Sequence, residues 1–226
     1  MIYYDKVCKV YPDKTIAIDQ VSFGVEAKEF VTIVGPSGAG KTTLMKMLIA
    51  EEWPSDGVIF FESTNIHKLS KKDITKLRRR VGTVFQDYRL IPSKTVYENI
   101  AFAMEAACMT DNEVASDVPH VLELVGLGHK IWNFPGQLSG GERQRAAIAR
   151  AIVTQPDIII ADEPASNLDP TNTAEIVRIL RKINELGTTV ILTTHNKTVV
   201  DFLGGRILSL DKGKIIKDDR NGKYVL

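Results

Sequence analysis

The 226-residue sequence has few cysteines, almost no charge imbalance and no long hydrophobic run. Its two cysteines are too few for a disulfide framework and lack metal-ligand spacing, so we expect two small buried side chains in a protein of a reducing compartment. The formal net charge of +1 lacks the excess typical of proteins that coat nucleic acids or adsorb strongly to membranes. What remains is a globular chain long enough to bury a substantial interior.

Secretion and membrane signals are also missing. The N-terminal stretch MIYYDKVCKV has no apolar run that resembles a signal peptide. No uninterrupted apolar stretch approaches the roughly 18 residues of a membrane span. We therefore expect a soluble chain, for which any membrane role comes through a partner.

The hydrophobic pattern divides the chain into three zones. Residues 2–61 hold short β-rich runs such as FVTIV, followed by the helical spacing of KTTLMKMLI. Residues 73–154 are mostly helical, and the β pattern nearly vanishes there. After Pro156 the β-rich runs DIIIAD and TTVILTTH return without polar alternation, as in parallel strands covered on both faces. This order predicts an α/β core interrupted by a helical insert.

The segment GPSGAGKTT fits the phosphate-loop pattern G-x-x-x-x-G-K-[ST] between a predicted strand and a predicted helix. Its glycines let backbone N–H groups turn toward phosphates, Lys41 reaches the β- and γ-phosphates, and Thr42 supplies a hydroxyl to Mg²⁺. A glycine-rich turn without a ligand is the alternative, which the flanking strand and helix disfavour. The predicted ATP-binding residues of this loop are Gly35, Pro36, Ser37, Gly38, Ala39, Gly40, Lys41, Thr42 and Thr43.

Two consecutive carboxylates end the buried-strand pattern DIIIADEP. Side chains alternate along a strand, so Asp162 and Glu163 should point in different directions. Asp162 suits the Mg²⁺ shell, while Glu163 could polarise a water in line with the γ-phosphate. An acidic pair alone is also typical of a solvated turn or a helix N-cap; together with the phosphate loop, it indicates a nucleotide-hydrolysing site.

The segment LSGGERQR looks like a second phosphate-binding device. Ser139 and Glu142 have capping-box spacing, so a helix should start at Gly140 and Gly141 and continue through ERQRAAIARAIV. The N-terminus of that helix carries partial positive charge and free N–H groups, which suit an anion. By spacing alone, an ordinary capped helix with a basic outer face is the commoner interpretation.

Taken together, these motifs resemble those of the ATP-binding-cassette (ABC) ATPases. Residues 138–142 are similar to the family's signature, and its other motifs follow in order along nearly the whole chain. Tyr11 resembles the aromatic residue that stacks on adenine, and Gln86 in VFQDYRL resembles the Q-loop glutamine that senses Mg²⁺ and the γ-phosphate. Asp169 in SNLDP resembles the D-loop aspartate, and His195 in LTTH resembles the switch histidine that contacts the γ-phosphate.

The resemblance implies a fold and its subdivision. It implies one ABC ATPase domain over residues 1–226, with a P-loop NTPase (RecA-like) core at 1–86 and 157–226 that is built on a mostly parallel sheet. An N-terminal antiparallel β subdomain and an inserted α-helical subdomain at 87–156, which carries the signature, complete the implied fold.

The resemblance also implies cofactors, roles and assembly. ATP and Mg²⁺ are implied, with the metal held by Thr42, Gln86 and Asp162, and the implied catalytic residues are Glu163, His195 and Gln86. Two cassettes of this family dimerise head to tail, so Ser139, Gly140, Gly141 and Glu142 of one protomer would lie over the nucleotide of the other. Because the chain holds one phosphate loop, a homodimer around two ATP is the simplest assembly.

Other P-loop classes fit less well. A GTPase needs a guanine-reading Asn-Lys-x-Asp, but Asn196-Lys197 is followed by Thr198 and Val199. A small-molecule kinase would not ordinarily explain LSGGERQR.

A closer resemblance is carried by MLIAEEWPSDG, FQDYRLIPSKTVYENIAFA, NFPGQLSGGERQR and TTHNKTVVD. These stretches are similar to a cell-division branch of the family, which acts at the cytoplasmic face with an integral membrane protein that activates cell-wall hydrolases outside. The ATPase of a lipoprotein-releasing or macrolide-export system stays open as an alternative. A cassette acting on DNA or ribosomes is disfavoured by the near-neutral charge and the lack of a second cassette, so no nucleic acid is expected.

In this family a cytoplasmic helix of the membrane partner docks in a groove beside the Q-loop. Tyr88, Leu90 and Tyr97 are the candidate groove residues because of their aromatic or apolar character just after Gln86; packing between core and insert is the alternative. Two features depart from the usual pattern. Ala165 stands where related cassettes usually have Thr, and EEWPSDG places a large aromatic residue, Trp53, in a loop expected to be exposed.

Overall fold

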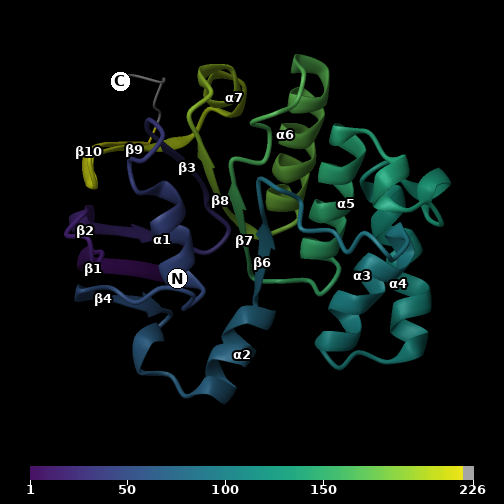
Figure 1. Ribbon diagram of the computed structural model, residues 1–226, viewed down its shortest axis with the longest axis horizontal. Helices are drawn as coiled ribbons and strands as arrows, with labels where there is room; N and C mark the ends of the chain where they lie inside the picture. The colour runs from purple at the N-terminus through teal and green to yellow at the C-terminus, as the bar shows by residue number, and fades with distance from the viewer. Residues whose placement is uncertain (221–226) are drawn as a thin grey trace.

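The computed structural model describes residues 1–220 as two sheets with helices packed around them (Figure 1). One sheet has four antiparallel strands in the order β2-β1-β4-β5, and the other has six strands in the order β10-β9-β3-β8-β7-β6. The strands are β1 Ile2–Val10, β2 Ile16–Val25, β3 Phe30–Val34, β4 Asp56–Phe61, β5 Thr64–Asn65, β6 Val81–Val84, β7 Ile158–Asp162, β8 Thr189–Thr194, β9 Arg206–Asp211 and β10 Lys214–Asp219.

The six-stranded sheet is parallel except at β10, which pairs antiparallel with β9. Every residue of β8 is buried, as are the first four of β7, which confirms the prediction of parallel strands covered on both faces. Because parallel strands end at one edge, the residues that follow β3, β7 and β8 come together there. The mostly parallel α/β fold is thus confirmed.

Helices cover the six-stranded sheet and extend it on one side. The α-helices are α1 Lys41–Leu48, α2 Lys71–Arg79, α3 Val96–Ala106, α4 Asp111–Leu124, α5 Gly140–Ile152, α6 Pro170–Glu185 and α7 Lys197–Leu203, with short 3₁₀ turns η1 Ile66–Lys68, η2 Gly128–Lys130 and η3 Pro135–Gln137. Figure 1 shows α3, α4 and α5 beyond the β6 edge and the four-stranded sheet on the opposite side. Helix α1 contacts both β2 and β7, so it joins the two sheets into one core.

Two expectations about the chain are wrong. Residues 73–154 were expected to have almost no β structure, yet β6 pairs with β7 in this range, with Val81 opposite Ile158. This four-residue strand follows directly on the basic end of α2, so it is too short to show a period. The two cysteines are not buried: Cys8 is half-buried and Cys108 is exposed, because the latter lies in a left-handed turn (φ +64°) just after α3.

Trp53 and Ala165, the two departures from the family pattern, lie in different environments. Trp53 is 49% exposed, as expected for its loop, and packs edge-on against the ring of His67. Ala165 is buried in the core around α3 to α6. Within residues 1–220, no helix is long and apolar enough to cross a membrane.

Candidate functional site

The phosphate loop joins β3 to α1, and its last glycine has a conformation that other residues rarely adopt. Gly40 has a φ of +106°, and a Cβ at this position would lie 2.4 Å from the carbonyl oxygen of Ala17. Gly40 provides no side-chain cap, and the first turn of α1 has no acidic residue, whereas the other α-helices of residues 1–220 begin at a capping side chain. The positive end of α1 is therefore suited to an external anion such as a phosphate.

Lys41 is a buried cation at the start of α1, with 6% of its surface exposed. Its Nζ donates hydrogen bonds to the carbonyl oxygens of Gly35 (2.7 Å) and Pro36 (3.1 Å). The same Nζ lies 3.3 Å from Oε1 of Glu163. The loop backbone thus holds one positive charge beside the acidic end of β7.

The two carboxylates at the end of β7 contact different groups, as predicted. Asp162 accepts hydrogen bonds from the hydroxyls of Thr42 (2.7 Å) and Thr193. The backbone turns at Glu163, which has a φ of +49° and donates its N–H to the carbonyl of Thr193 (3.1 Å). Because β7 ends at Asp162, this left-handed turn contributes to the divergence that strand alternation predicted.

Glu163 has one carboxylate oxygen in contact with two basic groups and one without a protein partner. Oε1 lies 2.9 Å from Nδ1 of His195 and 3.3 Å from Nζ of Lys41. Oε2 is buried and has no hydrogen-bond partner within the described residues. A buried carboxylate oxygen without a partner is costly for stability, which is typical of a site that binds or transforms a ligand.

Two adjoining cavities connect these residues. One, of about 380 Å³, is lined by Tyr11, Ser37, Gly38, Gly40, Lys41, Thr42, Thr43, Gln86, Glu163 and His195, together with Thr15, Ile16 and Ala17. The other, of about 410 Å³, shares Thr42 and Gln86 with the first and also contains Asp162. Most of the predicted ATP and metal residues therefore line two neighbouring cavities, whereas Ala39 lines neither and is buried. Gly35 and Pro36 instead serve as acceptors for Lys41.

The three residues predicted to hold Mg²⁺ fit that ion chemically. Thr42, Gln86 and Asp162 all line the 410 Å³ cavity and offer a hydroxyl, an amide and a carboxylate oxygen, the hard ligands that Mg²⁺ prefers. The 2.7 Å contact between Oγ1 of Thr42 and Oδ2 of Asp162 places two of these oxygens together.

Several residues of the site were not predicted. Thr15, Ile16 and Ala17 line the 380 Å³ cavity, but they precede the phosphate loop by about 20 residues and carry no motif. Thr193 contacts both Asp162 and the backbone of Glu163. Its position two residues before His195 in the predicted strand was the only available signal.

The signature segment forms the predicted capping box at the start of α5. Ser139 Oγ accepts from the N–H of Glu142 (3.2 Å), and the Glu142 carboxylate accepts from the N–H of Ser139 (2.7 Å), which lowers the pKa of Glu142. A Cβ at Gly141 would lie 2.0 Å from Oδ1 of Asn172, so a larger residue there would displace the Asn172 side chain of α6. Hydrogen bonds from the Asn172 side chain and backbone lower the pKa of Asp169, which caps α6.

The signature and the D-loop do not line either nucleotide-site cavity. Ser139, Gly140, Gly141, Glu142 and Asp169 are absent from both linings. Figure 1 shows α1 and α5 on opposite sides of β6 and β7. Within one chain, the two phosphate-binding motifs therefore lie apart.

A third cavity, of about 520 Å³, lies between α2, β6, α3 and α5. Tyr88, Leu90 and Tyr97, the residues predicted for a partner groove, are not among its lining residues. Leu90 and Tyr97 pack against the core that the helices α3 to α6 form with the six-stranded sheet, as the alternative interpretation held. The lining instead includes Phe85, Arg89, Ile91, Phe102 and Arg150. The assignment of Tyr88, Leu90 and Tyr97 to a partner contact therefore stays a prediction.

Comparison with known proteins places the chain in a family. The family model described as "ABC transporter" matches residues 18–166. The cell division ATP-binding protein FtsE of Streptococcus pneumoniae serotype 2 (strain D39 / NCTC 7466) is 48% identical over 218 residues, covering 96% of this chain and 95% of that protein. FtsE of Bacillus subtilis (strain 168) is 44% identical over 224 residues, covering 99% and 98% of the two chains.

Solved structures agree with this assignment. The ATP-binding cassette MJ0796, a dimer in a post-hydrolysis state bound to ADP and Pi, superimposes with a TM-score of 0.89 at 33% identity and covers 99% of this chain and 100% of that one. The phosphate loop, the paired carboxylates and the signature described above lie in the order that the family resemblance implied. The chain belongs to the ABC transporter family and is an ATP-binding-cassette ATPase.

Proposed function

We propose that this chain is the ATP-hydrolysing subunit of a membrane complex of the FtsE and FtsX type. Two copies close around two ATP, and the closure changes the conformation of an integral membrane partner that regulates cell-wall hydrolysis during cell division. The similarity to FtsE over nearly the full chain supports this proposal. The chain then acts as a peripheral subunit at the cytoplasmic face of the membrane.

The observation that carries the hydrolytic function is the placement of Glu163. Its Oε2 is buried without a protein partner at the nucleotide cavity, while Oε1 is held by His195 and Lys41. We infer that Oε2 accepts the proton of the attacking water and that His195 fixes the orientation of the carboxylate. Hydrolysis then breaks the bond between the β–γ bridging oxygen and the γ-phosphorus, and the water oxygen becomes part of the released phosphate.

The remaining site residues bind and orient the nucleotide. Lys41 and the uncapped N-terminus of α1 neutralise phosphate charge, and Tyr11 offers a ring for the adenine at the cavity mouth. Mg²⁺, when bound, supplies further charge neutralisation at the phosphates. Thr42, Gln86 and Asp162 would hold it. The N-terminus of α5 serves the nucleotide of the second protomer, which fits its distance from the phosphate loop of its own chain.

We further propose that the 520 Å³ groove receives the membrane partner. Its lining comes from residues 75–85, in the proposed core, and from residues 89–154, in the proposed helical subdomain. Its lining combines the apolar side chains of Phe85, Ile91 and Phe102 with arginines, a composition that is typical of protein interfaces. Phe102 is 48% exposed, so this groove offers an aromatic side chain that a partner can cover.

Recovery of the partner from solubilised membranes tests this function. The wild-type chain should retain an integral membrane protein similar to FtsX, and Phe102→Asp should lose it while still binding ATP. Phe202→Asp on α7 is a matched control, since Phe202 is also exposed (43%) on a helix but lies outside the groove. Recovery of a lipoprotein-releasing or macrolide-export type partner would support the alternative function. Retention of nucleic acid in place of a membrane protein would contradict both.

A further inference from the structure

The loop after β6 contains a strained pair of residues. Tyr88 and Arg89 have φ values of +60° and +48°, and they are the one consecutive pair of non-glycine residues in this conformation within residues 1–220. The left-handed region is unfavourable for a residue that has a Cβ atom. Two such residues in succession therefore need a restraint from outside the loop. The pair comes two residues after Gln86, which lines both nucleotide-site cavities.

One arginine of α5 supplies that restraint. Arg150 donates from Nη2 to the carbonyl oxygen of Tyr88 (2.9 Å) and from Nη1 to the carbonyl oxygen of Arg89. The two parallel N–H groups of a guanidinium suit two neighbouring carbonyls, which the single ammonium of a lysine does not. Arg150 is thus bonded to the backbone of both strained residues.

The guanidinium of Arg150 is a half-buried charge. Burial lowers the pKa of its guanidinium and the nearby charge of Arg89 lowers it further, while Asp87 opposes the shift. No carboxylate within the described residues forms an ion pair with it. A half-buried charge is unfavourable for folding unless hydrogen bonds compensate it, and the printed hydrogen bonds of Arg150 go to the loop backbone.

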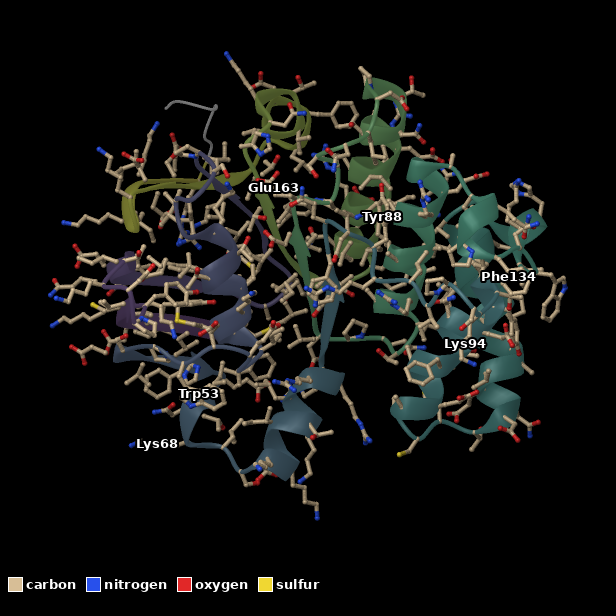
Figure 2. All side chains as sticks on the ribbon, in the orientation of Figure 1. Trp53, Lys68, Tyr88, Lys94, Phe134 and Glu163 are labelled. Carbon is tan, nitrogen blue, oxygen red and sulfur yellow. The ribbon has the colours of Figure 1, made fainter. Side chains whose placement is uncertain are left out.

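The same loop also contacts the start of α5. A Cβ at Gly140 would lie 3.4 Å from the hydroxyl oxygen of Tyr88, and the Arg143 guanidinium lies over the Tyr88 ring at 5.5 Å. In Figure 2, Tyr88 lies between β6 and α5. Arg89 and Arg150 also line the 520 Å³ groove. The loop, the signature helix and the groove therefore meet at Arg150.

We propose that Arg150 is a positioning residue that holds the strained loop against α5 and thereby keeps Gln86 at the phosphate site. Without it, Tyr88 and Arg89 relax toward the right-handed region, and Gln86 leaves its position between the two cavities. Nucleotide affinity should change little, because Lys41 and the N-terminus of α1 do not depend on this loop. The inference requires the ATPase activity of the chain but not the identity of its membrane partner.

The first test separates turnover from binding in the purified protein. Arg150→Met removes both N–H donors and keeps an unbranched apolar side chain. We expect kcat to fall by about 10-fold or more, on the scale of a misplaced catalytic contact, with KM for ATP within about 2-fold of wild type. Arg150→Lys should give an intermediate kcat. Arg178→Met on α6, which loses a guanidinium stacked over Phe202, is the control and should keep wild-type kcat.

A double-mutant cycle distinguishes positioning from a general structural role. If Arg150 acts through Gln86, then Arg150→Met in a Gln86→Ala background should slow turnover little beyond Gln86→Ala alone. In addition, Arg89→Gly should restore part of the kcat lost in Arg150→Met, because glycine adopts positive φ without a steric cost.

Three results would overturn the proposal: multiplicative losses in the cycle, a change in KM alone, or wild-type kcat in Arg150→Met. Circular dichroism melting checks that every variant is folded at the assay temperature. If Arg150→Met does not fold, Arg150→Lys takes its place in the same cycle with the same criteria.

Discussion

The carboxylate of Glu163 lies 2.9 Å from Nδ1 of His195, with Nζ of Lys41 on the same oxygen at 3.3 Å. One oxygen of this carboxylate is therefore oriented by two basic residues, and the other has no hydrogen-bond partner among residues 1–220. Lys41 also belongs to the phosphate loop. Binding of phosphate at this loop therefore changes the charge beside Glu163, which links nucleotide binding to the residue that we propose as the base.

Glu163→Gln tests the role of this carboxylate. The amide keeps the size of the side chain but cannot accept a proton from water, so hydrolysis should slow by about 10²-fold or more. ATP binding should persist, and dimers should accumulate when ATP is added. The measurements are the rate of phosphate release and the dimer fraction in gel filtration with ATP. Near-normal turnover would assign the proton acceptor to another group.

Asn99 should contribute strongly to the stability of α3 and of the loop that precedes it. Its buried amide accepts from the N–H of Ile91 and donates to the carbonyls of Ile91, Lys94 and Thr95, so it fixes the segment that follows the Q-loop. Asn99→Leu leaves these buried groups without partners and should lower the free energy of unfolding by about 3 kcal/mol. Urea unfolding measures this. Asn167→Leu, at an exposed position, is the control, and an equal effect of both would contradict the account.

The ion pair between Arg206 and Asp218 predicts a pH dependence of stability. Hydrogen bonds from Arg206 lower the pKa of Asp218, so the carboxylate stabilises the fold above its unfolded pKa of about 3.9 and loses this contribution as the pH falls through its lower folded pKa. The melting temperature of wild type should exceed that of Asp218→Asn at pH 7. The difference should shrink below about pH 4. A constant difference down to pH 2 would show that the charge of Asp218 is not its cause.

Site residues could be predicted from the sequence where a motif lies at the predicted end of a strand or helix. Ser139 and Glu142 form the capping box that their spacing predicted, and Asp162 and Glu163 diverge as expected. Short strands and loop conformations could not be predicted from local sequence patterns. The four-residue strand β6 was missed, and no local pattern reveals the left-handed backbone of Tyr88 and Arg89. The contacts of Arg150 depend on tertiary packing and were likewise not predicted.

The central claim is that the signature of one protomer serves the nucleotide of the other. Lys41→Ala removes a positive charge that neutralises phosphate, and Ser139→Arg blocks the N-terminus of α5. Each substitution should therefore inactivate both nucleotide sites of a homodimer. A tandem that joins one half of each kind rebuilds one intact site from the phosphate loop of the Ser139→Arg half and the signature of the Lys41→Ala half. Joining the halves also raises their effective concentration to the millimolar range for a suitable linker.

Retention of ATP by these tandems after rapid dilution is the most direct measurement. The account predicts about one tightly held ATP per mixed tandem, two in the wild-type tandem and none in either tandem of identical mutants, as follows from one rebuilt site out of two. If the mixed tandem retains none while the wild-type tandem retains two, the signature does not act across the dimer. It would then act on its own chain or serve only as a helix cap.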